Sequence, residues 1–265
     1  MCSYHPGLEH IVGYTQREYS VPPTYMLASI NYLISKSEYL PFFNGFTTKP
    51  YLGRETNRSF YQENIGGPYR ISRSYSFQPG FFLKDNRQEQ KFINSVEEMR
   101  HIIDDAFFFT TMQSLPETIS IAVCSIDELK QAHASFGQWS DGILGFAVHS
   151  KPIRKIFLLQ APLDELLVTL GHELGHVFTD SLATMHDEEA KAFSFSIAWV
   201  SAIKKHNIAN LASSIKDVFD FKPAKNGLHD VSFGFVQHLM KKGISPMELH
   251  WNLVKGYSSL FGFYN

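Results

Sequence analysis

The chain carries an H-E-x-x-H motif within Gly171-His172-Glu173-Leu174-Gly175-His176. The surrounding apolar residues recur three and four positions apart, which predicts a helix over 162–178: Leu163, Leu166, Leu167, Leu170, Leu174, Val177 and Phe178. Residues four apart share one helix face, so His172 and His176 can reach a single metal ion. Glu173 would project beside that ion, where a carboxylate can take a proton from a coordinated water. These residues are the first candidates for a metal site and its catalytic base.

A second helix is predicted from residue 186, because Phe193, Ile197 and Val200 share one face and small residues lie between them. A zinc site needs at least three protein ligands, and an oxygen ligand commonly completes a pair of histidines. The start of this helix offers an acidic trio: Asp187, Glu188 and Glu189. These carboxylates are candidate third ligands, although acidic residues at a helix N-terminus can also be simply solvated.

The HELGH sequence followed by an acidic, alanine-rich helix resembles the gluzincin branch of the zincin metallopeptidases. It looks most like the small ImmA/IrrE-type metallopeptidases, whose second helix reads roughly Glu-x-x-Ala-x-x-Phe-Ala. The resemblance covers residues 95–205. It implies a Zn²⁺ cofactor held by His172 and His176, with Glu173 as the catalytic base.

Two registers of the second helix fit that pattern. Glu189 has Ala192 three residues later, and Asp187 has Ala190 three residues later. Glutamate is the usual ligand in the group that the chain resembles, which favours Glu189, with Asp187 and Glu188 as alternatives. A small residue at this spacing would let the two helices approach closely.

Other zinc-binding classes fit poorly. A metzincin would carry glycine at position 179 and histidine at 182, but the chain has Thr179 and Leu182. A zinc finger is disfavoured because the only cysteines, Cys2 and Cys124, lie far apart.

The wider pattern predicts an α+β fold, with a zincin-like core of a small mixed sheet, an active-site helix and a metal-ligand helix, followed by C-terminal helices. Helices are expected over 95–109, 125–134, 211–219, 230–242 and 246–260. Strands are expected over 118–124, 142–150 and 154–160. The strand over 142–150 is our candidate for a free sheet edge that could bind a peptide by strand addition.

Two regions are expected along the chain. Residues 1–90 contain one predicted helix over 23–37 and then an irregular, aromatic-rich run, which predicts an ordered segment packed on the core. That segment could line or block a substrate cleft. Residues 91–265 would form the zincin-like metallopeptidase domain.

The composition and charge limit the classes of binding partner that we expect. The formal net charge is −2 and no block of lysine and arginine stands out, so no nucleic-acid footprint is evident. No secretory signal and no apolar run long enough for a bilayer is present. Two cysteines fit a reducing compartment. We therefore expect a cytoplasmic protein without membrane contact.

The expected function is zinc-dependent hydrolysis of peptide bonds, in a peptide or a restricted protein substrate. His229 or Tyr257, both downstream of the motif, could stabilise the oxyanion of the tetrahedral intermediate. The alternative is a non-catalytic or regulatory metal-binding module that retains the zincin fold. The intact Glu173 favours catalysis, since a purely structural site has no need of it.

Overall fold

The computed structural model describes residues 10–11, 78–137, 139–219 and 227–261, which all belong to one compact unit. The stretch predicted as a helix over 23–37 lies outside the described residues, as does the aromatic-rich run up to residue 77. Residues 78–90 are described, and Phe82 and Leu83 of this segment are buried in the main core.

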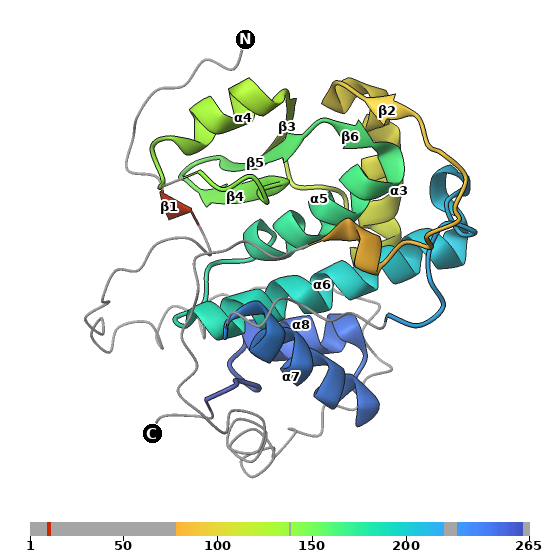
Figure 1. Cartoon of the computed structure of the whole chain (residues 1–265). Coiled ribbons are helices and arrows are strands. Elements are labelled where there is room, and N and C mark those ends of the chain that lie inside the picture. The colour runs from red at the N-terminus through yellow and green to blue at the C-terminus, as the bar shows by residue number, and fades with distance from the viewer. Residues whose placement is uncertain (1–9, 12–77, 138, 220–226, 262–265) are drawn as a thin grey trace. The chain divides into compact units, whose positions relative to one another are not determined.

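A four-stranded mixed sheet forms the upper part of the molecule in Figure 1, in the order β1-β4-β5-β3. Its strands are β1 (His10–Ile11), β3 (Ile119–Cys124), β4 (Gly145–His149) and β5 (Arg154–Leu159). Strand β5 runs parallel to β3 and antiparallel to β4. The strands predicted over 118–124, 142–150 and 154–160 are confirmed. A separate antiparallel pair, β2 (Phe92–Ile93) with β6 (Ala161–Pro162), lies just before the motif helix.

The expectation of a free edge at β4 is wrong for the C-terminal end of that strand. Strand β1 pairs with β4 in antiparallel register, placing His10 opposite His149 and Ile11 opposite Val148. Strand β1 therefore occupies the outer edge of β4 at Val148 and His149, where a peptide could add only in place of β1.

Helices cover both faces of the sheet (Figure 1). The α-helices are α3 (Arg100–Thr111), α4 (Ile126–His133), α5 (Leu163–Val177), α6 (Met185–His206), α7 (His229–Lys241) and α8 (Pro246–Val254). Among the described residues, three short 3₁₀ segments accompany them: η1 (Pro79–Phe81), η2 (Val96–Met99) and η3 (Ile208–Asn210). Helix α4 lies on one face of the sheet and α5 on the other, α6 packs along α5, and α7 and α8 pack on α6. The α+β class is thus confirmed.

Local capping signals explain where two of the helical segments begin. The backbone N–H of Ser125 donates to the Glu128 carboxylate over 2.9 Å, and the Ser125 hydroxyl accepts from the Glu128 N–H. Ser95 and Glu98 form the same capping box at η2, which continues directly into α3. Such reciprocal bonds satisfy donors that a helix start leaves unpaired.

The C-terminal helices differ in part from the prediction. The helices over 230–242 and 246–260 correspond to α7 and α8, but α8 ends at Val254 and Gly256 follows with a φ of 69°. No helix forms over 211–219. There the backbone N–H of Lys84 donates to Ser214, and that of Lys216 donates to Phe82. Pairing with a segment distant in sequence has overridden the local helical pattern.

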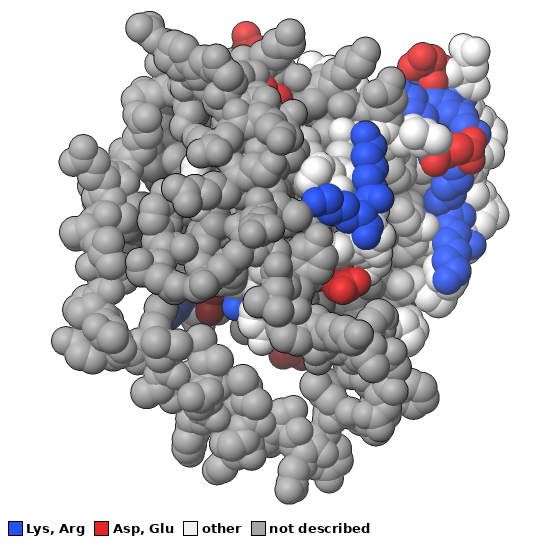
Figure 2. All heavy atoms as spheres, turned by 90° about the horizontal axis from the view of Figure 1, so that it is seen from below, with Lys and Arg blue, Asp and Glu red and all other residues white. Residues whose placement is uncertain are grey.

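On the face shown in Figure 2, lysine and arginine side chains lie beside acidic ones on the described surface. None of the helices in the described ranges is long and apolar enough to span a membrane.

Two glycines of the motif helix let α6 approach it closely. A Cβ on Gly171 would lie 2.4 Å from the Trp199 ring, and one on Gly175 would lie 2.7 Å from the Cα of Ala192. The Trp199 indole N–H also donates to the carbonyl of Leu167 over 2.9 Å. The small residue expected at position 192 therefore lies at the helix crossing.

We predict that Gly175→Ala destabilises the fold. The added methyl would meet backbone atoms of Ala192, which cannot rotate away, so α6 must shift. Overpacking costs about 1–3 kcal/mol, whereas the gain in helix propensity is at most about 1 kcal/mol. Thermal unfolding should show a lowered midpoint for Gly175→Ala. The control is Gly80→Ala, where a methyl would meet nothing within 4 Å. An equal or higher midpoint for Gly175→Ala would contradict the close-approach argument.

Candidate metal centre

Helices α5 and α6 bring three donor side chains together. One ligand atom each from His172, His176 and Glu189 lies within 4.8 Å of the others, and all three residues are buried. The Nε2 of His172 is 3.5 Å from Glu189 Oε2, and the Nε2 of His176 is 3.8 Å from Glu189 Oε1. Among the described residues, this candidate metal-binding group, called the donor group below, combines both histidines of the motif with Glu189, the acidic residue favoured from the sequence.

Asp187, one of the two alternative third ligands, stabilises the fold through hydrogen bonds. Its carboxylate accepts hydrogen bonds from the Ser259 hydroxyl over 2.8 Å, the Leu260 N–H over 2.7 Å and the Thr184 hydroxyl over 2.9 Å. These bonds tie the chain that follows α8 to the start of α6. Asp187 therefore lies outside the donor group.

Glu188, the other alternative, contacts a candidate ligand. Its Oε1 accepts from His176 Nδ1 over 3.0 Å, and its Oε2 accepts from the Leu182 N–H over 2.7 Å. The exposed fractions of Asp187, Glu188 and Glu189 are 7%, 3% and 3%. The idea that some of this trio is merely solvated is therefore wrong, because α5 and the chain after α8 cover the start of α6.

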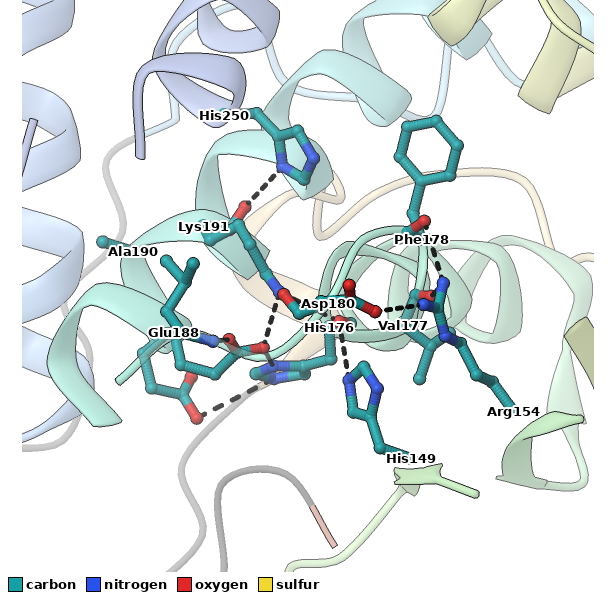
Figure 3. Close-up of polar contacts among 12 residues, drawn as sticks. His149, Arg154, His176, Val177, Phe178, Asp180, Glu188, Ala190, Lys191 and His250 are labelled. Carbon is teal, nitrogen blue, oxygen red and sulfur yellow. Dashed lines mark hydrogen bonds and ion pairs between the residues drawn. The ribbon is translucent and has the colours of Figure 1, made fainter. Parts of the chain in front are cut away.

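Lys191 is a buried cation that the sequence analysis missed. Its Nζ lies 2.9 Å from Glu188 Oε1 and donates to the carbonyls of His176 and Asp180, each over 3.0 Å (Figure 3). The only available signal was its place three residues after Glu188, between the small residues Ala190 and Ala192, where the helix would be tightly packed.

The C-terminal end of α5 is held from the sheet side as well. The His149 ring Nε2 donates to the His176 carbonyl over 3.0 Å, and Arg154 donates to the carbonyl of Val177 over 2.8 Å (Figure 3). Arg154 also pairs with Asp180, which lies just beyond the helix. Carbonyls at a helix end lack intrahelical partners, so these donors stabilise the turn that carries His176.

The electrostatics favour the protonation states that a metal needs at His172 and Glu189, whereas at His176 they favour the protonated ring, which must lose a proton before it can bind a metal. Burial lowers the pKa of His172 to about 4, so its imidazole is neutral at pH 7. Burial alone would lower the pKa of His176, but the carboxylates of Glu189 and Glu188 outweigh it and raise that pKa. Burial opposes ionisation of Glu189, yet His229 and His176 hold its pKa well below the ordinary value.

The donor set suits a divalent metal. Two imidazole nitrogens and one carboxylate oxygen are a ligand combination that catalytic zinc sites use. Glu189 Oε2 is buried without a hydrogen bond, and it faces His172 Nε2 at 3.5 Å and His229 Nε2 at 3.6 Å. A buried carboxylate oxygen surrounded by imidazole nitrogens at this range fits a cation held between them.

The remaining predicted residues take different places. Glu173 is 3% exposed and lies outside the donor group, although its charge acts on His176. The ring Nε2 of His229, the first residue of α7, lies 3.6 Å from Oε2 of the candidate ligand Glu189. Tyr257 follows α8 and is 53% exposed, and no contact joins it to the donor group in the described residues.

Comparisons of the chain with protein families, with curated proteins and with solved structures find no match in any of the three.

We predict that Glu189→Ala abolishes binding of Zn²⁺, whereas Asp187→Ala lowers stability and leaves zinc affinity within a few-fold of wild type. The reason is that Glu189 alone of the acidic trio joins both histidines, while Asp187 bonds to the chain after α8. Isothermal titration of metal-free protein with Zn²⁺, together with thermal unfolding, separates the two effects. Equal zinc affinity in Glu189→Ala and wild type would contradict the assignment of the third ligand.

Proposed function

We propose that the chain is a zinc-dependent metallopeptidase with a zincin-like core, which hydrolyses peptide bonds of a restricted protein substrate. One observation carries the proposal: two buried carboxylates lie at the site in different roles. Glu189 joins His172 and His176 in the donor group, while Glu173 lies beside them and outside it. Three protein donors leave a coordination position open, which is typical of catalytic rather than structural zinc sites.

The residues of the chain divide the reaction between them. A zinc ion in such a site acts as a Lewis acid that lowers the pKa of water toward about 7 and polarises a carbonyl group. Glu173 accepts the proton of the attacking water and passes it to the leaving amine nitrogen. The exposed fractions of His172, Glu173 and His176 are 1–3%, so bulk water is excluded and charge interactions strengthen.

His229 is our candidate for stabilising the developing oxyanion. Its ring Nε2 lies 3.6 Å from Glu189 Oε2, yet it does not join the donor group. A side chain in that position can donate to a substrate oxygen next to the metal. Asp230 follows it and accepts the backbone N–H of Gly227 over 2.8 Å, which stabilises the turn that presents His229.

The arrangement of the elements supports the zincin-like interpretation. A small mixed sheet packs on the helix that carries H-E-x-x-H, and the next helix supplies the acidic donor. This is the order that the resemblance to ImmA/IrrE-type metallopeptidases implies. Burial of the whole donor group favours a substrate that is admitted selectively over general digestion of peptides.

A non-catalytic metal-binding module is the alternative. The donor group and its hydrogen-bonded neighbours would serve that function equally well. Glu173 distinguishes the two, because a carboxylate beside the ligand histidines is needed to move the proton of a metal-activated water, whereas a purely structural metal site has no use for it.

We predict that Glu173→Gln binds Zn²⁺ like wild type and lowers kcat by about 10²–10⁴-fold, the usual contribution of a general base. Cleavage of a broad peptide library, followed by mass spectrometry, measures the activity, and elemental analysis measures the zinc. The control is Glu165→Gln in the first turn of the same helix, which should cleave as wild type does. Undiminished cleavage by Glu173→Gln would rule out Glu173 as the base. Zinc binding without any cleavage by wild type would favour the non-catalytic module.

A further inference from the structure

A buried ion pair lies directly behind one of the candidate ligands. Lys191 is 0% exposed and Glu188 is 3% exposed, and their charged groups are 2.9 Å apart. The Lys191 ammonium has three protons, and three oxygens surround it: Glu188 Oε1 and the carbonyls of His176 and Asp180. All donors of this cation are therefore used inside the protein.

The pair fixes His176 at two points. Its ring Nδ1 donates to Glu188, so the neutral imidazole keeps its proton on Nδ1 and leaves the Nε2 lone pair for a metal. Its backbone carbonyl accepts from Lys191 and from His149. Ring orientation, tautomer and main chain are thus all held by residues that are not ligands.

The charge of Lys191 also decides what Glu188 can do. Glu188 directly precedes Glu189, and a free carboxylate next to a divalent cation is itself a good ligand. Lys191 neutralises Glu188 and holds its Oε1 on the side of His176 that faces away from Glu189. The pair then adds no net charge, and Glu189 is left as the oxygen donor.

We propose that Glu188 and Lys191 are positioning residues of the metal site: Glu188 orients His176, and Lys191 keeps Glu188 in that task and out of the coordination shell. The inference rests on the metal site of the proposed function and does not depend on peptide hydrolysis. Residues that hydrogen-bond a ligating histidine typically contribute about 10- to 100-fold to metal affinity.

A merely structural ion pair is the competing explanation, and the chain contains a control that has the same kinds of partner but is more exposed, at 28% for Lys204 and 81% for Asp217. Lys204 lies on the same helix, and its ammonium likewise binds one carboxylate and two carbonyls: Asp217 at 2.7 Å, Lys216 at 2.8 Å and Ile215 at 3.3 Å. Within the part of the chain that the structure describes, none of the polar contacts of Lys204 reaches the donor group. Removing this cation tests for loss of an ion pair on α6 without any change near the metal site.

The test uses Co²⁺ as a spectroscopic probe of the full chain. The variants are Glu188→Gln, Lys191→Met, the double variant and Lys204→Met, each examined by Co²⁺ titration, visible absorption and thermal unfolding without metal. Each single substitution at the pair leaves one buried charge unpaired and should lower the unfolding midpoint. The double variant removes both charges and should regain much of that midpoint.

A positioning role and a purely structural role of the ion pair predict different Co²⁺ affinities for the double variant. We expect Glu188→Gln and the double variant both to bind Co²⁺ about 10- to 100-fold more weakly than wild type. Lys191→Met should change the visible spectrum, because Glu188 is free to join the metal. Lys204→Met should bind Co²⁺ as wild type does.

Two outcomes would overturn the inference. One is a double variant whose Co²⁺ affinity recovers together with its stability, and the other is a wild-type chain that binds no Co²⁺. If wild type binds Co²⁺ with the expected differences but cleaves no peptide, the positioning role stands and the proposed peptidase function fails.

Discussion

The close crossing of α5 and α6 is the contact on which the candidate site depends. Gly171 and Gly175 leave no side chain between the helices, so Trp199 and the backbone of Ala192 pack directly against α5. The glycines flank His172 and His176 within the same turns of helix. Because the backbones are so close, Glu189 on α6 reaches both imidazoles. Packing and metal-ligand geometry therefore arise from one local arrangement, and a methyl group added there would affect both.

The first turn of α6 shows how three neighbouring acidic residues acquire separate roles. A helix turns by about 100° per residue, so consecutive side chains point in different directions. Asp187 faces the chain after α8, Glu188 faces the Nδ1 of His176, and Glu189 faces both histidines. All three are buried, and each has its own partners to offset the cost of desolvating a carboxylate. Lys191, one turn later, supplies the positive charge for Glu188.

The predictable part of the site is the part that one helix contains. Spacing along α5 places His172 and His176 on one face, and the capping boxes at Ser95 and Ser125 mark helical starts that the structure contains. The local pattern limited the third ligand to three neighbouring carboxylates without deciding between them, since the helix pattern fits best with Asp187 whereas the usual residue type favours Glu189. Lys191 and His149 escaped notice because their importance comes from backbone carbonyls near the end of α5. No sequence pattern indicates which side chains will donate to those backbone carbonyls.

The sequence by itself determined the helical periodicity, the positions of the three strands that precede the motif, the α+β class and the pair of candidate histidines. These follow from side-chain patterns within single segments. The tertiary structure decided which carboxylate meets those histidines, that the whole acidic trio is buried, and that β1 pairs with the expected free edge of β4. It also replaced the helix predicted over 211–219 with pairing to residues 82–84. The physical reason is the same in each case. These outcomes depend on contacts between segments far apart in the chain, whose free energies exceed local conformational preferences.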